Sequence, residues 1–234
     1  MGNIVDDIRA NEDTFADRPF NEVDSLALAQ LSYARMPVNV PRLDAEATDV
    51  DLAMVGVRDL LRAECYDDMF GKVWSPSMNV DLLRAMCESP RWRDLRVGGY
   101  VDEFDPETTK QFSACVFDVG DGSSYVAFRG TDSTIVGWKE DFAMAFRRLV
   151  AAQESAARYL ADIAGRRDGP LMVGGHSKGG NLAVYAAANV PSEIQERITV
   201  VYSHDGPGFD EAFFDEDGYV RIASKIHKSV PGSS

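Results

Sequence analysis

The residues with the clearest chemical meaning are Gly175 to Gly179, which read Gly-His-Ser-Lys-Gly. An apolar run at 171–173 precedes them and an alanine-rich stretch at 181–188 follows. A serine flanked by glycines between a strand and a helix is typical of a nucleophile on a sharp turn, because bulky neighbours do not fit there. Such a turn also brings the hydroxyl to a helix N-terminus, which favours developing negative charge. The sequence therefore predicts that Ser177 is a nucleophile.

A second motif, Phe-Arg-Gly-Thr-Asp at 128–132, ends a predicted strand. Acyl transfer needs two N–H donors for the oxyanion, one directly after the nucleophile and one from an earlier strand end. By position we expect these donors to be the backbone N–H groups of Lys178 and Thr131, with Gly130 allowing close approach. Taken alone, the motif would be read as a turn with a capping threonine, and the serine motif makes the oxyanion role the favoured one.

A nucleophilic serine also needs a histidine base and a carboxylate that fixes the histidine tautomer. In a strand–serine–helix arrangement of this kind, the acid follows the serine in the chain and the base comes last. Asp205 follows the apolar run 198–202 and precedes a Gly-Pro-Gly turn, so we expect it to be the acid. The alternative is an ordinary turn or capping aspartate, which Asp-Gly sequences often supply.

The chain has three histidines. His176 lies inside the serine motif, and His204 should point to the other side of a strand from Asp205. His227 comes late enough in the chain to be the base. We expect one of three situations: a base located in sequence beyond Ser234, His227 as the base, or a protein without activity, and we rank the first of these highest.

The elements that must position these residues change character along the chain. The N-terminal third has helical periodicity and no obvious chemistry. Its expected helices follow Asn21, Thr48 and Asn79. Later come expected strands at 112–117, 124–128, 171–174, 198–202 and 219–223, with a long helix over 149–163. The first two strands should form a hairpin, and the strand–helix alternation predicts parallel strands with right-handed crossovers. The expected fold class is α/β, a three-layer sandwich around a central, mostly parallel sheet.

Composition limits the remaining possibilities. The 234 residues suit one domain, with residues 1–20 as a polar, poorly ordered lead-in. The net charge of −14 makes nucleic acid and anionic lipid surfaces poor partners. Three scattered cysteines are expected to be buried, reduced thiols of a cytoplasmic protein. The N-terminus lacks a signal-peptide pattern, no segment has the apolar length of a membrane span, and no metal or cofactor is expected.

The motifs together resemble the fungal-type, class-three lipases, and more closely an uncharacterised bacterial family of lipase-like α/β-hydrolases. The resemblance extends over most of the chain and includes the surroundings of Tyr33 and Tyr100. Its specific motifs lie at 111–114, 128–132, 137–142, 174–181 and 205–209. The resemblance implies an α/β-hydrolase fold, ester hydrolysis, and further sequence that ends in a strand and a loop histidine.

Two departures from the class-three lipases stand out. Lys178 replaces a leucine, and its side chain is expected to point to solvent, with an anionic headgroup as the alternative contact. The stretch before Val230 and Pro231 lacks the carboxylate that those lipases carry there. The aromatic segment 132–146 occupies the place of their helical lid, and an ordinary surface helix is an equal alternative.

The leading hypothesis is a serine esterase that forms an acyl-enzyme on Ser177 with a small ester or lipid substrate. The alternative is a catalytically inactive, lipase-like binding or scaffold protein that lacks the base histidine. Nucleotide binding is disfavoured, because the glycine-rich turn lacks the spacing that cradles phosphates.

Overall fold

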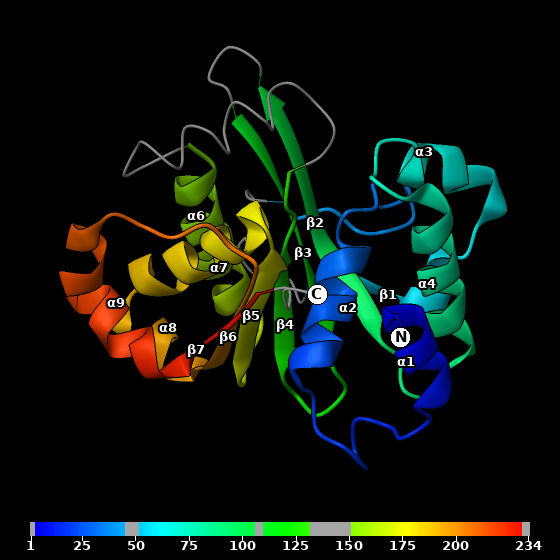
Figure 1. The fold of residues 1–234 in the computed structure, drawn as a ribbon, viewed down its shortest axis with the longest axis horizontal. Helices are drawn as coiled ribbons and strands as arrows, with labels where there is room; N and C mark the ends of the chain where they lie inside the picture. Colours follow the sequence, from blue (N-terminus) through cyan, green and yellow to red (C-terminus); the bar gives the residue numbers. More distant parts are fainter. Residues whose placement is uncertain (1–2, 45–51, 106–109, 132–150, 231–234) are drawn as a thin grey trace.

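The computed structural model describes residues 3–44, 52–105, 110–131 and 151–230. Its seven strands form one sheet in chain order, with helices on both faces (Figure 1). The strands are β1 (Met54–Gly56), β2 (Arg96–Asp105), β3 (Lys110–Asp118), β4 (Ser124–Phe128), β5 (Leu171–His176), β6 (Ile198–His204) and β7 (Ile226–Ser229). The α-helices are α1 (Ile4–Ala10), α2 (Glu22–Leu31), α3 (Tyr66–Phe70), α4 (Pro76–Glu88), α6 (Ala151–Arg166), α7 (Lys178–Asn189), α8 (Ser192–Arg197) and α9 (Asp217–Ile222).

The sheet is mixed, and its two halves follow different rules. Neighbouring strands from β1 to β4 are antiparallel, which confirms the hairpin expected from 112–117 and 124–128. Neighbouring strands from β4 to β7 are parallel and are joined through helices. The α/β fold class is therefore confirmed, and the parallel half carries the expected serine and aspartate at the carboxyl ends of its strands.

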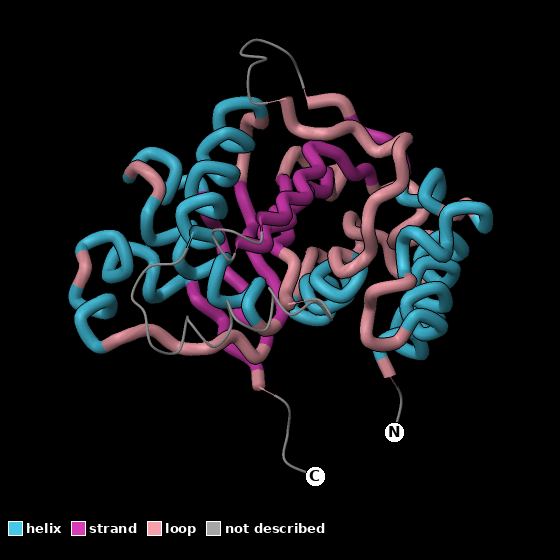
Figure 2. Tube along the Cα trace, turned by 90° about the horizontal axis from the view of Figure 1, so that it is seen from above, coloured by secondary structure: helices cyan, strands magenta, loops and turns pink. Residues whose placement is uncertain are grey.

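Two apolar layers enclose the sheet. Helices α6 to α9 cover one face, and α1, α2 and α4 lie on the other (Figures 1 and 2). All five residues of β4 are buried, as expected for a strand covered on both faces. Among the described residues, no helix has the length and apolar character needed to cross a membrane.

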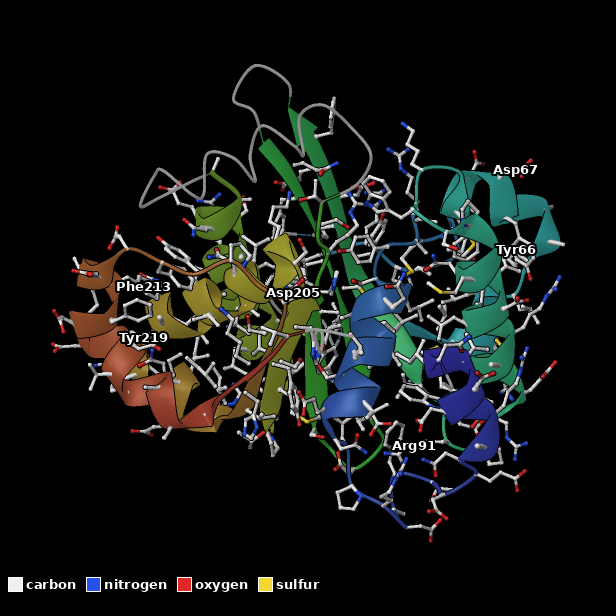
Figure 3. The ribbon with its side chains drawn as sticks, viewed as in Figure 1. Tyr66, Asp67, Arg91, Asp205, Phe213 and Tyr219 are labelled. Carbon is white, nitrogen blue, oxygen red and sulfur yellow. The ribbon has the colours of Figure 1, made fainter. Side chains whose placement is uncertain are left out.

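The N-terminal lead-in is packed rather than loosely attached. Helix α1 buries Val5 and Ile8, and Asn3 caps it. The buried guanidinium of Arg91, labelled in Figure 3, pairs with Asp24 of α2 at 2.5 Å. It also donates to four backbone carbonyls between residues 13 and 19. The expected disorder of residues 1–20 is therefore wrong for the described part, because one buried charge organises this loop.

Helix α2 begins where the sequence indicates. The Asn21 side chain accepts hydrogen bonds from the first turn, and the Asn21 backbone N–H donates to the Asp24 carboxylate at 2.9 Å. The helix expected from Asn79 begins earlier, at Pro76. Asn79 lies within its first turn and donates to the carbonyl of Ser75 at 2.8 Å.

Two expected elements take another form. The predicted helix after Thr48, a residue outside the described ranges, is replaced by β1 and a 3₁₀ turn over 57–60, because pairing with β2 overrides the local apolar periodicity. The predicted strand at 219–223 belongs to α9 and a following 3₁₀ turn. Val220 there is 61% exposed and Ile222 is buried, so the run has one outward and one inward side, as on an amphipathic helix, and the last strand is instead β7.

Candidate functional site

Ser177 occupies a strained turn between β5 and α7. Its φ of 55° and ψ of −128° lie outside the usual regions for a residue with a side chain. The Ser177 N–H donates to the carbonyl of His204 at 2.8 Å, and the Ser177 carbonyl accepts from Gly180 at 2.9 Å. The turn is thus held by β6 on one side and by the first turn of α7 on the other.

The glycines on either side of Ser177 are required by backbone packing. A Cβ atom on Gly179 would lie 2.1 Å from the carbonyl oxygen of Phe128 in β4. A Cβ atom on Gly175 would lie 2.4 Å from the carbonyl carbon of Gly179. The motif needs glycines because three backbone segments are in direct contact here: the ends of β4 and β5 and the start of α7.

The two expected oxyanion donors lie on either side of this contact. Lys178 is the first residue of α7, where the amide groups have no acceptor within the helix. Thr131 follows β4 and lines the same cavity as Ser177. Arg129, two residues before Thr131, is held in place because its buried guanidinium forms an ion pair with Asp102 at 2.8 Å.

The Lys178 side chain does not follow the expectation. It is 1% exposed, and its ammonium donates to the backbone carbonyl of Gln111 at 2.9 Å. The expected orientation toward solvent is therefore wrong. The side chain turns into the interior against β3 and away from solvent.

Asp205 directly follows β6 at the level of the serine turn. The register pairs His176 with His204, so Ser177 and Asp205 leave neighbouring strands at one level. Asp205 is exposed, has a φ of 51°, and its N–H donates to the carbonyl of Ser229 at 2.7 Å (Figure 3). Aspartate is one of the non-glycine residues that adopt such a φ most often, so this conformation fits both a site residue and an ordinary Asp-Gly turn.

His176 lines the cavity in front of Ser177. Its Nδ1 lies 2.9 Å from the hydroxyl of Tyr33, which follows α2. Burial lowers the pKa of His176, and the negative charge of Asp205 raises it by a smaller amount. The imidazole is therefore neutral at pH 7. The Tyr33 hydroxyl also fills the space over Gly130, where an added Cβ atom would lie 2.0 Å away.

His204 belongs to a buried polar network. Its Nε2 lies 2.9 Å from the hydroxyl of Ser25 in α2, and its Nδ1 lies 2.7 Å from the hydroxyl of Ser229 in β7. The Ser25 hydroxyl continues to Tyr125 at 2.8 Å. Burial lowers the pKa of His204 to about 4. Because both ring nitrogens have partners, His204 ties β6 to α2 and β7.

The structure does not bring His227 to Ser177. His227 lies on β7 opposite Tyr202, with ring centroids 5.7 Å apart, and the β5 residue at that level is Gly174. Ser177 is therefore about 10 Å further along the strands and about 10 Å across them. Within the described part of the chain, no hydrogen bond joins the Ser177 hydroxyl to an imidazole. We therefore do not assign His227 the role of base.

A cavity of about 390 Å³ opens in front of Ser177. Its walls come partly from α2 and partly from the start of α4 and the residues before it, including Met78 and Trp74. Sequence reasoning missed these wall residues, because no motif or spacing links the N-terminal third to the serine. The segment 132–146, expected as a lid or a surface helix, lies outside the described residues.

The described residues contain no group of three or more His, Cys, Asp or Glu side chains that could hold a metal ion. The three cysteines are free thiols, with Cys115 buried and the other two half-buried. Burial raises the pKa of Cys115 to about 12, which suppresses its nucleophilic thiolate form. Ser177 lines the cavity, and no cysteine is among the described residues that line it with Ser177.

Comparison with solved structures identifies two fungal lipases of similar fold. A fungal lipase–inhibitor complex, the basis of a model for interfacial activation in lipases, is 16% identical, with a TM-score of 0.44, over 64% of this chain and 60% of that chain. The native propeptide complex of Rhizomucor miehei lipase is 15% identical, with a TM-score of 0.42, over 87% of this chain and 72% of that chain. The present chain thus spans 60% of the length of the first of these.

A family model described as Mbeg1-like matches residues 86–234, which is more than half of the chain. The chain therefore belongs to the Mbeg1-like family. The search of curated proteins found no match.

Proposed function

We propose that this protein is a serine hydrolase that cleaves carboxylic esters through an acyl-enzyme on Ser177. The observation that carries the proposal is the positive φ of Ser177 at the tip of β5, beside a cavity and at the start of α7. Strain of this kind persists only where the surrounding structure enforces it, and it concentrates at functional sites.

In the proposed reaction, the Ser177 oxygen attacks the ester carbonyl carbon and gives up its proton to a base. The carbonyl oxygen becomes an oxyanion, held by the backbone N–H groups of Lys178 and Thr131. Two such donors contribute several kcal/mol in total, at about 3 kcal/mol each. The bond to the leaving alcohol then breaks, the alcohol takes the proton, and water releases the acyl group in the same way.

Asp205 is the carboxylate of our proposal. It leaves β6 beside the serine turn and acts electrostatically on the imidazole that lines the cavity. We do not propose His204 as the base, because both of its ring nitrogens are hydrogen-bonded. We do not propose His227 either, because it lies far from Ser177. The proposal therefore rests on the nucleophile and the oxyanion donors rather than on a complete triad.

One observation favours a second function. In the described residues, no imidazole is hydrogen-bonded to the Ser177 hydroxyl. This absence of a base fits a lipase-like protein that binds esters without cleaving them. Turnover of p-nitrophenyl butanoate by the wild-type chain and by Ser177→Ala separates the two proposals. Hydrolysis that disappears in Ser177→Ala supports the esterase, whereas binding of the ester without turnover in either protein supports the binding protein.

A further inference from the structure

The cavity in front of Ser177 has an uncharged lining in a strongly acidic protein. None of the described residues that line it is an Asp, Glu, Lys or Arg, although the chain has a net charge of −14. The imidazole of His176, which lines the cavity, is kept neutral at pH 7 because burial lowers its pKa. Among the described lining residues, a charged ligand group would therefore lose its hydration without meeting an opposite charge.

One wall of the cavity is apolar and comes from a single segment. Val73 and Trp74 lie just before α4, and Met78 lies in its first turn. Trp74 is 69% exposed, so its ring stands at the mouth rather than in the core. Burying one ligand methylene against such a surface strengthens binding about fourfold, which corresponds to about 0.8 kcal/mol.

Hydrogen bonds hold this wall in place relative to the serine. Gln30 of α2 lines the cavity and donates to the side chain of buried Asn79 at 3.0 Å. Asn79 in turn donates to the carbonyl of Ser75 at 2.8 Å, directly after Trp74. The wall is thus tied to α2, whose C-terminal extension also supplies Tyr33 beside His176.

We propose that the segment 73–78 is the specificity wall of the site, and that it selects neutral esters with a short to medium apolar chain. This inference rests on the proposed function, since it names the substrate class of the Ser177 site. The segment lies outside the residues 86–234 that the family model matches. The cavity of about 390 Å³ has the volume of about a dozen liquid water molecules, at about 30 Å³ each, which suits a ligand with a short to medium chain.

The test measures binding to Ser177→Ala by calorimetry, so that it does not depend on catalysis. Ethyl hexanoate should bind about 16-fold more tightly than ethyl butanoate, at about fourfold for each methylene. Monoethyl adipate, which has the chain length of ethyl hexanoate and a terminal carboxylate, should bind at least about 100-fold more weakly than ethyl hexanoate. Equal affinities for the neutral and the anionic ester would overturn the inference.

Two further variants in the same background locate the selectivity in this wall. Met78→Lys should reduce the preference for ethyl hexanoate over monoethyl adipate by at least tenfold. Ser77→Lys adds the same charge at an exposed neighbouring position outside the lining and should leave that preference unchanged. Equal effects of the two variants would contradict a local role of the wall.

Trp74→Ala provides an independent check, because Trp74 is exposed and its loss should not disturb folding. It should weaken ethyl hexanoate binding about tenfold and leave ethyl acetate binding unchanged. Equal weakening of both esters would overturn the assignment of Trp74. If the Ser177→Ala protein binds as described and the wild-type chain cleaves no ester, the inference stands and the proposed hydrolase function fails.

Discussion

The substitution Gly179→Ala tests the packing that creates the serine turn. The added Cβ atom would lie 2.1 Å from the carbonyl oxygen and 2.9 Å from the carbonyl carbon of Phe128, and 3.1 Å from the carbonyl carbon of Arg129. An ordinary carbon–oxygen contact is about 3.3–3.6 Å, so the backbones must separate by more than an ångström. All three atoms belong to the backbone, and no side-chain rotation relieves the clash.

Overpacking of this kind costs about 1–3 kcal/mol, and we expect the upper end of that range because the opposing atoms are fixed by the β4–β5 ladder. Gly165→Ala is the matched control. Gly165 lies in α6, and nothing lies within 4 Å of its added Cβ atom. Alanine there should stabilise the chain by about 0.4–1 kcal/mol. The two Gly→Ala substitutions should thus differ by about 3–4 kcal/mol in the free energy of unfolding.

Urea unfolding followed by circular dichroism measures this difference. Gly179→Ala should also slow the reaction of the chain with a fluorophosphonate, because the displaced backbone leads directly to Thr131. Free energies of unfolding for the two variants within about 0.5 kcal/mol of each other, with unchanged reactivity, would refute the packing argument.

Three further predictions concern side chains around the site and the N-terminal loop. Lys178→Met should lower the free energy of unfolding by about 1–3 kcal/mol, since it removes a buried hydrogen bond of the ammonium. It should keep the fluorophosphonate reaction rate within a few-fold, and a loss of 100-fold or more would assign the side chain itself a part in the reaction. In the folded chain the pKa of His204 is lowered to about 4, from an ordinary value of 6.5. Below pH 6.5 the unfolded chain therefore binds more protons at His204 than the folded chain does. Stability that is present above pH 6.5 should therefore fall by about 3 kcal/mol on the way to pH 4, and His204→Asn should remove that part of the pH dependence in urea titrations. Arg91→Met should cost about 3–5 kcal/mol in urea unfolding, because it leaves the buried carboxylate of Asp24 unpaired, whereas Arg93→Met, which removes an exposed charge, should change stability by less than about 0.5 kcal/mol.

The serine turn was predictable because its constraints are local. The strand at 171–173, the glycines and the alanine-rich helix are adjacent in sequence, and each has its own propensity. The β3–β4 hairpin was predictable for the same reason, since two apolar runs flank a Gly-Asp-Gly turn.

The elements that depend on distant partners were not predictable in this way. The pairing of β1 with β2 joins residues about 40 positions apart and overrides a helical pattern. The inward turn of Lys178 depends on the carbonyl of Gln111, and the packing of the N-terminal loop depends on Arg91. Sequence periodicity carries no information about such contacts.

The same distinction between local and distant constraints applies to the candidate site. The parallel topology gathers strand ends at one edge of the sheet, and the expected site residues there are Ser177, Lys178, Thr131 and Asp205. The cavity walls at Tyr33 and at 73–78 come instead from α2 and α4 and the residues next to them. Only tertiary packing brings them to the serine, which explains why the N-terminal third showed no chemistry in the sequence.

The central claim is that Ser177 is a reactive nucleophile, and the most direct measurement is mass mapping of a fluorophosphonate adduct. We predict one adduct, on the peptide that contains Ser177, and none in a folded Ser177→Ala variant. A folded wild-type chain that carries no adduct, or carries one on another residue, would contradict the account.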